Sequence, residues 1–324
     1  KGLKPLLVGR NDQKISSIAN QYDLPYKVLD IKNLKELNPI IENYALIINC
    51  AGPFSETADQ VIRYCIEMHL HYTDITGEIG VFEMAKTFDQ EAKEKNIMVM
   101  PGTGFDVVPS DCLAKYLSEK LPDATDLELA FNGGGGPSHG TMLTAISGLG
   151  KGGAIRKDGK IIEVPNAYEV KKFDFDKPGM SAATIPWGDV STAYYSTKIP
   201  NIKVFMAMPP KMIQSMKMLK YVQGILGLSI VKNLIKSQIK EGGPSEDSRA
   251  KSNSYLVGKV SNDKGASIMA KLKALDGYTL TAEASVLIAE KILAGNFKSG
   301  YQTPSSAYGY ELILEIRGSE LNDI

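Results

Sequence analysis

The chain has 324 residues, of which 43% are hydrophobic, and its 37 basic and 37 acidic residues give a formal net charge of zero. This length and apolar content suit two domains of ordinary size. The balanced charge, without a basic-aromatic motif, argues against a nucleic-acid partner, and no apolar run is long enough to span a bilayer. The three cysteines show neither CxxC spacing nor a histidine at metal-ligand spacing, so we expect a reduced, cytoplasmic protein without a metal site.

Short apolar stretches alternate with helical patterns over the first third of the chain. The expected strands are 6–8, 27–30, 45–49, 72–75 and 97–100, and the expected helices are 12–21, 34–42, 56–68 and 81–95. Asn33 and Ser55 stand where helix N-caps would be. Such alternation is typical of βαβ units, so we expect an α/β fold with a Rossmann-type, doubly wound parallel sheet.

Each of these expected strands ends in glycine or a polar residue. The ends read Gly9-Arg10-Asn11, then Asp30, then three longer stretches at 49–54, 74–78 and 101–106. In an open parallel sheet, ligands bind outside the carboxyl ends of the strands. Small residues there let a ligand approach the backbone, whose N–H groups can bind phosphate or ribose oxygens. The ordered series therefore predicts a dinucleotide site that includes Gly9, Arg10, Asn11 and Asp30.

Arg10 indicates which dinucleotide is bound. In such folds the end of the second strand meets the adenosine ribose, where an acid suits NAD and an arginine suits the 2′-phosphate of NADP. Guanidinium binds phosphate through paired, charge-assisted hydrogen bonds. The step from Gly9 to Asn11 has the cation and no acid, so NADP is the predicted cofactor. An ordinary solvated surface arginine is the alternative.

The position of Arg10 also predicts a strand and a glycine loop before it in the native sequence. If its strand is the second, the glycine loop after the first strand should precede it by about 20 residues. Residue 10 leaves no room for that loop. We therefore expect the native protein to begin before Lys1, with a first strand and a glycine loop that this sequence does not contain.

The pattern changes from about Asp126 onward. Strand-like stretches at 127–131, 160–164, 168–173, 203–208, 255–260 and 267–273 come with turn residues at 157–159 and 262–265. Hairpin turns of this kind predict an antiparallel or mixed sheet in a second, α+β domain over 125–277, for substrate binding and dimerisation. A strong helix at 278–293 follows. We expect the segment 278–324 to return to the first domain, which otherwise covers 1–124.

One segment, 211–240, carries six lysines and no acid around an apolar stretch. It fits a basic amphipathic helix packed on the second domain. It also fits a helix that lies on a membrane surface or docks a partner, because its charge has one sign. Peripheral contact of a cytoplasmic protein with a membrane is thus a second expectation.

Six motifs in order along the chain carry a family resemblance. They are LLVGRN (6–11), NCAGPF (49–54), YTDITGE (72–78), GTGFDVVPSD (102–111), GGPSEDSRA (242–250) and GYQTPSSAYG (300–309). The chain resembles the saccharopine dehydrogenase-like oxidoreductases, including the trans-acting enoyl reductase branch. The resemblance implies a Rossmann NADP-binding domain followed by an α+β domain, in a homodimer.

The resemblance also implies roles for individual positions around NADP. The adenosine phosphate would be held by Arg10 and Asn11, and the path from pyrophosphate to nicotinamide would be lined by Ala51, Gly52, Pro53 and Phe54. The nicotinamide ribose would be flanked by Asp74, Thr76 and Glu78. The point of hydride transfer would be bordered by Phe105, Asp106 and Val107. Structural interpretations stand beside these: Asp74 and Asp106 as turn caps, Gly52-Pro53 as a plain turn, and Phe54 as core.

The reaction needs a proton donor as well as a hydride. The candidate catalytic residues are Asp106, His139 and Tyr194, with Tyr195 as a further acid. His139 follows the glycine run 133–136, which could fold over a substrate or form a surface loop. The second domain offers only Arg156 and Arg249 as arginines. We therefore expect a neutral or lipid-like carbonyl, imine or enoyl substrate rather than saccharopine.

Two other functions stay open from the sequence. The first is a protein that binds a membrane or lipid surface and keeps a dinucleotide fold without turnover, because segment 211–240 is basic and no proton donor is obvious. The second is a chain without a working cofactor site, because the glycine loop is absent.

Overall fold

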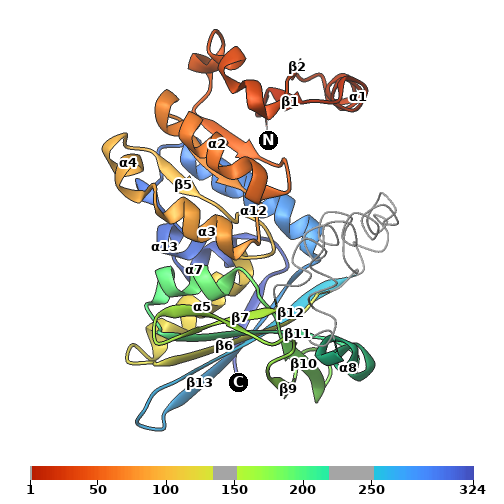
Figure 1. Cartoon of the computed structure of the whole chain (residues 1–324), viewed down its shortest axis with the longest axis vertical. Coiled ribbons are helices and arrows are strands. Elements are labelled where there is room, and N and C mark those ends of the chain that lie inside the picture. The colour runs from red at the N-terminus through yellow and green to blue at the C-terminus, as the bar shows by residue number, and fades with distance from the viewer. Residues whose placement is uncertain (1, 134–151, 219–251) are drawn as a thin grey trace.

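The computed structural model describes residues 2–133, 152–218 and 252–324 (Figure 1). The first part of the chain forms β1 (Leu7–Gly9), α1 (Asp12–Tyr22), β2 (Tyr26–Val28), η1 (Ile31–Leu37), η2 (Ile41–Asn43), β3 (Leu46–Asn49), α2 (Phe54–Met68), β4 (His71–Asp74), α3 (Ile79–Lys86), α4 (Asp89–Glu94), β5 (Met98–Met100) and α5 (Val108–Lys120). The rest forms β6 (Asp126–Asn132), β7 (Gly153–Lys157), β8 (Lys160–Val164), β9 (Val170–Phe173), β10 (Met180–Thr184), α7 (Asp189–Thr197), β11 (Asn201–Ala207), α8 (Pro210–Met218), β12 (Asn253–Ser261), β13 (Ser267–Leu275), α12 (Gly277–Leu293), β14 (Gly300–Tyr301), α13 (Pro304–Tyr308), η4 (Tyr310–Glu315) and β15 (Glu320–Asp323).

A parallel sheet of order β14-β5-β4-β3 forms the upper part of the molecule (Figure 1). Its strands are short and apolar, and Met98, Val99 and Met100 are fully buried, as the sequence pattern predicts. Helix α2 packs against β3 and β4, and α12 contacts the same strands. This α/β arrangement confirms the Rossmann-like fold expected from the alternation of strands and helices.

The strands β1 and β2 depart from the single sheet that the sequence predicts. They pair in parallel with each other, Leu7 opposite Tyr26, and form a separate two-stranded sheet. Among the described strands, neither β1 nor β2 pairs with β3, so the β1–β2 pair is not hydrogen-bonded to the sheet β14-β5-β4-β3. Val8 on β1 and Ile48 on β3 are 39% and 40% exposed. The expected strand before Lys1 stays a prediction.

A large mixed sheet forms the lower part (Figure 1). Its order is β15-β13-β12-β6-β11-β10-β9, with β7 joined to β11 and β8 to β7. The strands β6 and β11 are parallel and the other pairs are antiparallel. The turns predicted at 157–159 and 262–265 close the β7–β8 and β12–β13 hairpins. The mixed sheet expected for the second half of the chain is therefore confirmed.

The segment after residue 276 serves both sheets. Its helix α12 reaches the parallel sheet and its strand β14 extends that sheet beside β5, whereas β15 pairs with β13 of the large sheet. Leu113 and Leu117 of α5 pack in one apolar core with Leu280 of α12 and Leu312 of η4. The predicted return of 278–324 to the first domain thus describes only part of its course. The boundaries proposed for the two domains stay predictions.

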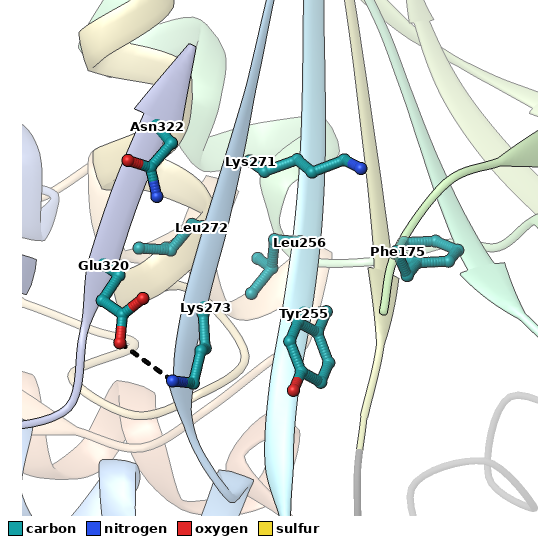
Figure 2. A pocket seen from close by; sticks show the side chains of 8 residues that line it. All are labelled: Phe175, Tyr255, Leu256, Lys271, Leu272, Lys273, Glu320 and Asn322. Atoms are coloured by element: carbon teal, nitrogen blue, oxygen red, sulfur yellow. Dashed lines mark hydrogen bonds and ion pairs between the residues drawn. The ribbon is translucent and has the colours of Figure 1, made fainter. Parts of the chain in front are cut away.

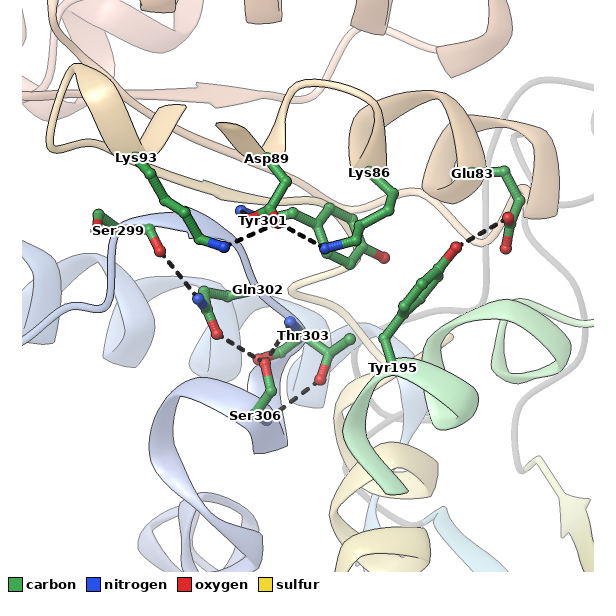
Figure 3. Close-up of polar contacts among 10 residues, drawn as sticks. All are labelled: Glu83, Lys86, Asp89, Lys93, Tyr195, Ser299, Tyr301, Gln302, Thr303 and Ser306. Carbon is green, nitrogen blue, oxygen red and sulfur yellow. Dashed lines mark hydrogen bonds and ion pairs between the residues drawn. The ribbon is translucent and has the colours of Figure 1, made fainter. Parts of the chain in front are cut away.

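Two predicted helices are interrupted. The segment 34–42 forms the 3-10 helices η1 and η2 instead of one α-helix, because Pro39 has no N–H for a helical hydrogen bond; Asp30 rather than Asn33 caps η1. The segment 81–95 divides into α3 and α4 at Thr87 and Phe88. At this break Asp89 accepts hydrogen bonds from Lys86 Nζ (2.7 Å), Lys93 Nζ (2.9 Å) and the Tyr301 amide (2.9 Å) (Figure 3).

Candidate functional site

A buried hydrogen-bond network joins the carboxyl ends of β3 and β4. Asn49 Nδ2 donates to Tyr72 Oη (3.3 Å), and Tyr72 Oη donates to Asp74 Oδ2 (2.6 Å). Asn49 Oδ1 in turn accepts the Ala51 amide at 3.0 Å. The network holds the loop after β3, which includes Ala51 and the cis Gly52–Pro53 peptide bond. The loop predicted to line the cofactor is therefore held in place by buried hydrogen bonds at the end of β3.

Asp74 connects the loop after β4 with the loop after β5. It is fully buried, and its Oδ1 accepts the amides of Thr76 (2.9 Å) and Gly102 (2.8 Å). Its carbonyl oxygen accepts the Thr103 amide at 2.7 Å. Burial raises the pKa of Asp74 to about 6, although these hydrogen bonds act in the opposite direction. Both carboxylate oxygens are engaged within the chain, as in the structural interpretation of Asp74, and a ribose contact stays a prediction.

Glu78 provides the N-cap of α2 from another loop. Its Oε1 accepts the Phe54 amide at 2.9 Å and its Oε2 accepts the Ser55 amide at 3.3 Å. Pro53 stands at the N-cap position and gives no side-chain hydrogen bond, so the expected cap at Ser55 is wrong. A carboxylate at this helix end is favourable because the free N–H groups there carry partial positive charge. Glu78 thus fixes Phe54 beside the loop after β4.

Asp106 lies in the loop between β5 and α5, directly against Gly77. A Cβ atom on Gly77 would stand 2.4 Å from Asp106 Oδ2, so only glycine fits there. Burial raises the pKa of Asp106 to about 7. This carboxyl therefore gains or loses its proton near neutral pH, which suits a general acid or base.

The second half of the chain reaches the same region through the loop before α7. Trp187 packs on Phe131 with ring centroids 4.8 Å apart, and Phe131 meets Phe105 at 6.1 Å. A Cβ on Gly188 would lie 2.8 Å from the Phe82 ring of α3 and 3.4 Å from the Gly77 carbonyl oxygen. The candidate site is therefore the junction between the strand-end loops of the parallel sheet and the large sheet.

The residues after β1 and β2 lie on the surface. Asn11 caps α1 by accepting the Lys14 amide at 3.0 Å, and Asp30 caps η1 by accepting the Lys32 amide at 2.9 Å. Gly9 faces Ile15, and Arg10 is exposed without a carboxylate partner among the described residues. Two of the predicted cofactor contacts thus have a capping role, while the guanidinium of Arg10 stays available to an anion.

Tyr194 and Tyr195 lie at a different contact between the two sheets, formed by α3, β7 and α7. The Arg156 guanidinium stands 4.3 Å from the centre of the Tyr194 ring and donates to Glu83 Oε1 at 3.0 Å. Tyr195 Oη donates to Glu83 Oε2 at 2.9 Å (Figure 3). No described contact joins Tyr194 to Asp106, so a catalytic role for Tyr194 stays a prediction. His139 lies outside the described residues.

The sequence interpretation did not identify Glu83 or Asp189, and it named Arg156 without its ion-pair partner. Glu83 and Arg156 form an ion pair in which the arginine side chain is only 4% exposed. Asp189, at the start of α7, is fully buried, and its Oδ2 lies 2.9 Å from Ser110 Oγ. Ser110, the partner of Asp189, lies within the motif GTGFDVVPSD, so this motif was the sequence signal that could have drawn attention to the contact.

A shallow hollow of about 170 Å³ lies elsewhere, on the large sheet (Figure 2). Its lining residues are Phe175, Tyr255, Leu256, Lys271, Leu272, Lys273, Glu320 and Asn322. Lys273 pairs with Glu320 there at 2.9 Å, and none of the predicted site residues takes part. Within the described ranges no cluster of three His, Cys, Asp or Glu side chains could hold a metal ion, and no helix is long and apolar enough to cross a membrane.

Comparison with known proteins gives one family match. Residues 3–100 match the family described as saccharopine dehydrogenase NADP binding domain. The saccharopine dehydrogenase-like oxidoreductase of Rattus norvegicus is 28% identical over 152 residues, which cover 45% of this chain and 35% of that protein. The lipid droplet localized protein of Caenorhabditis elegans is 26% identical over 179 residues, or 49% of this chain and 42% of that protein. The matched part thus spans well under two thirds of these relatives.

Among the solved structures, a saccharopine dehydrogenase has a similar fold. Saccharopine dehydrogenase (L-Glu forming) from Saccharomyces cerevisiae superposes with a TM-score of 0.66 and covers 100% of this chain and 95% of its own, at 12% sequence identity. These matches confirm the resemblance to saccharopine dehydrogenase-like oxidoreductases and the Rossmann-like fold predicted with it, while the enoyl reductase branch stays a prediction.

Proposed function

We propose that the chain acts as an NADP(H)-dependent oxidoreductase on a carbonyl, imine or enoyl group, a proposal supported by the match of residues 3–100 to the saccharopine dehydrogenase NADP binding domain. The cofactor, when bound, supplies or accepts the hydride, while the protein places the substrate and handles the proton. The observation that carries the proposal is the position of Asp106, a half-buried residue whose pKa of about 7 suits proton transfer, where the strand-end loops meet the large sheet.

The adenosine end of the cofactor fits the surface after β1. Arg10 is exposed beside the capped start of α1 and has no carboxylate partner among the described residues. Asp30, the acid at the end of β2, is engaged with the Lys32 amide. A 2′-phosphate would therefore meet the exposed guanidinium of Arg10, which supports NADP over NAD.

The nicotinamide end fits the loops that Asp74 and Glu78 hold. Asp74 fixes the amides of Thr76 and Gly102, and Glu78 fixes Phe54. These internal hydrogen bonds set the shape of the loops before a ligand arrives. Preorganised loops lose less conformational freedom on binding and hold a ring in one orientation.

The substrate that we propose is neutral or lipid-like. Arg156 is buried in its ion pair with Glu83 and is not available for a substrate carboxylate, and Arg249 lies outside the described residues. The junction beside Asp106 offers the aromatic rings of Phe105 and Trp187 instead. Apolar and aromatic walls beside Asp106 suit a neutral carbonyl or enoyl compound.

The test is a fluorescence titration of the full chain with NADPH and with NADH. We expect tighter binding of NADPH, and we expect Arg10→Ala to weaken NADPH much more than NADH. Lys14→Ala is the matched control, because it removes one positive charge from α1 without changing the strand end. Equal affinity for the two cofactors, or binding of neither, would contradict the proposal.

A second candidate function is contact with a lipid surface. The helix α8 begins the basic segment 211–240 and exposes Lys211, Met212 and Lys217; residues 219–240 lie outside the described part. The Caenorhabditis elegans relative is named for lipid droplets. Flotation with phosphatidylserine vesicles should show binding that high salt abolishes, and neutral vesicles are the control. Absence of salt-sensitive binding would leave the helix a packing element.

A homodimer is also proposed, on the family resemblance. Sedimentation equilibrium of the full chain measures it, and a monomer at all accessible concentrations would contradict it.

A further inference from the structure

Asp189 is a buried acid that the reaction scheme above does not use. It is the first residue of α7 and directly follows the Trp187-Gly188 loop at the junction. Its side chain is fully buried, and its Oδ2 lies 2.9 Å from Ser110 Oγ. Its Oδ1 is buried and has no hydrogen-bond partner within the described structure. An ionised carboxylate in this position would therefore have a single donor.

Counting hydrogen atoms around Ser110 indicates the protonation state of Asp189. Ser110 Oγ carries one hydrogen but has two acceptors in range, Asp189 Oδ2 at 2.9 Å and the Val107 carbonyl oxygen at 3.2 Å. If Asp189 is neutral, its O–H donates to Ser110 Oγ, and the Ser110 hydroxyl donates to Val107. Both contacts are then satisfied by one hydrogen each. If Asp189 is ionised, one contact is lost and a charge is buried with one donor, which is costly.

The charges around Asp189 favour the neutral acid as well. Asp111 on α5 has both carboxylate oxygens occupied, by Ser196 Oγ at 2.6 Å and by the Ser305 amide at 2.8 Å, so it holds a negative charge more easily. Asp106 precedes α5. Burial first, and then the charges of Asp111 and Asp106, raise the pKa of Asp189 well above its ordinary value, whereas Ser110 acts in the opposite direction.

The positive charge of Arg156 does not compensate for a charge on Asp189. Arg156 on β7 donates to the carbonyl oxygen of Val190, the residue after Asp189, but its charge is paired with Glu83. The buried Cys112 thiol on α5 has a pKa well above its usual range and stays neutral. The surroundings of Asp189 therefore contain carboxylates and neutral groups.

We propose that Asp189 is held as a neutral carboxylic acid and acts as a positioning residue for Asp106. Two ionised carboxylates close together in a buried junction would repel each other and push the titration of Asp106 to higher pH. A neutral Asp189 removes that repulsion, so Asp106 can release and regain its proton near neutral pH. This role rests on the proposed function, since it assigns Asp106 the proton transfer.

The test follows the carboxyl groups themselves. In the full chain labelled with ¹³C at the aspartate carboxyl carbons, we expect one signal to stay protonated from pH 5 to pH 8. The signal should vanish in Asp189→Asn and persist in Asp106→Asn and Ser110→Ala. If no aspartate signal stays protonated up to pH 8, or if the protonated signal persists in Asp189→Asn, the proposal is wrong. The measurement needs no cofactor, so its outcome is independent of NADPH binding, which tests the proposed function.

Two serine variants give a second reading that does not require Asp189→Asn to fold. Ser196→Ala removes one of the two donors to the Asp111 carboxyl, whereas Ser110→Ala removes a partner of neutral Asp189. We expect the urea midpoint at pH 7 to fall less in Ser110→Ala than in Ser196→Ala. A larger fall in Ser110→Ala would mean that Ser110 supports a buried charge, and would overturn the proposal.

The pH profile of turnover links this state to Asp106. Asparagine has the shape of the neutral acid, so Asp189→Asn should leave the limb assigned to Asp106 at its wild-type pH. A downward shift of that limb would show that wild-type Asp189 carries a charge, contrary to the proposal.

Discussion

The raised pKa of Asp106 makes the stability of the fold depend on pH. Burial moves this pKa from 3.8 to about 7, so between these values the folded chain holds a proton that the unfolded chain has released. A shift of about three pH units corresponds to roughly 4 kcal/mol. Stability from this group is therefore complete below about pH 4 and is lost as the pH rises through about 7.

Asp106→Asn removes this dependence, because the amide cannot ionise. We expect the free energy of unfolding of the variant, relative to wild type, to rise by up to roughly 4 kcal/mol between pH 4 and pH 8. Urea unfolding followed by circular dichroism at several pH values measures the difference. Asp158→Asn is the control, because Asp158 is exposed at the β7–β8 turn with a positive φ that asparagine also tolerates. If the free energies of unfolding of the wild type and Asp106→Asn change with pH in parallel, the pKa of Asp106 is not raised in the folded chain.

Three further predictions concern other contacts of the site. Arg10→Ala should weaken NADPH binding by about 1.5–3 kcal/mol with a much smaller effect on NADH, as measured by titration, and similar losses for both would contradict a phosphate contact. Glu83→Ala leaves the buried Arg156 without its anion and should lower the free energy of unfolding by about 2 kcal/mol. This loss is smaller than that expected for breaking a fully buried ion pair, because the Glu83 side chain is 38% exposed. Urea unfolding measures the loss, with Glu83→Gln as the milder control. Glu78→Ala should cost about 1 kcal/mol as a lost helix cap and raise the KM for NADPH, whereas an unchanged KM would separate the cap from the site.

Local patterns predicted the parallel sheet well. The strands β3, β4 and β5 and the helix α2 stand within two residues of their expected positions, because short apolar runs and helical periodicity are properties of neighbouring residues. The interruption between α3 and α4 was not predictable in this way. Asp89 at that break accepts the amide of Tyr301, which is 212 residues away in the chain.

The candidate site shows the same division. The strand-end series correctly singled out Asp74, Glu78 and Asp106 as residues at one edge of the sheet, but their partners depend on tertiary contacts. Glu78 reaches the start of α2 from a loop 24 residues away, and Ser110 meets Asp189 across 79 residues. The sequence shows which residue types stand at the edge of the sheet. The fold is needed to show which carboxyl caps a helix, which one holds a loop and which one can transfer a proton.

The path of the chain between the two sheets has a consequence for working with pieces of this protein. The chain passes from the parallel sheet to the large sheet after α5, returns through α12 and β14, and ends in the large sheet with β15. Each sheet is therefore assembled from segments that are far apart in the sequence. Expression of residues 2–125 alone would omit β14 and α12, and a fragment ending at 275 would deprive both sheets of an edge strand. Gene fusions or split reporters should therefore use the intact chain.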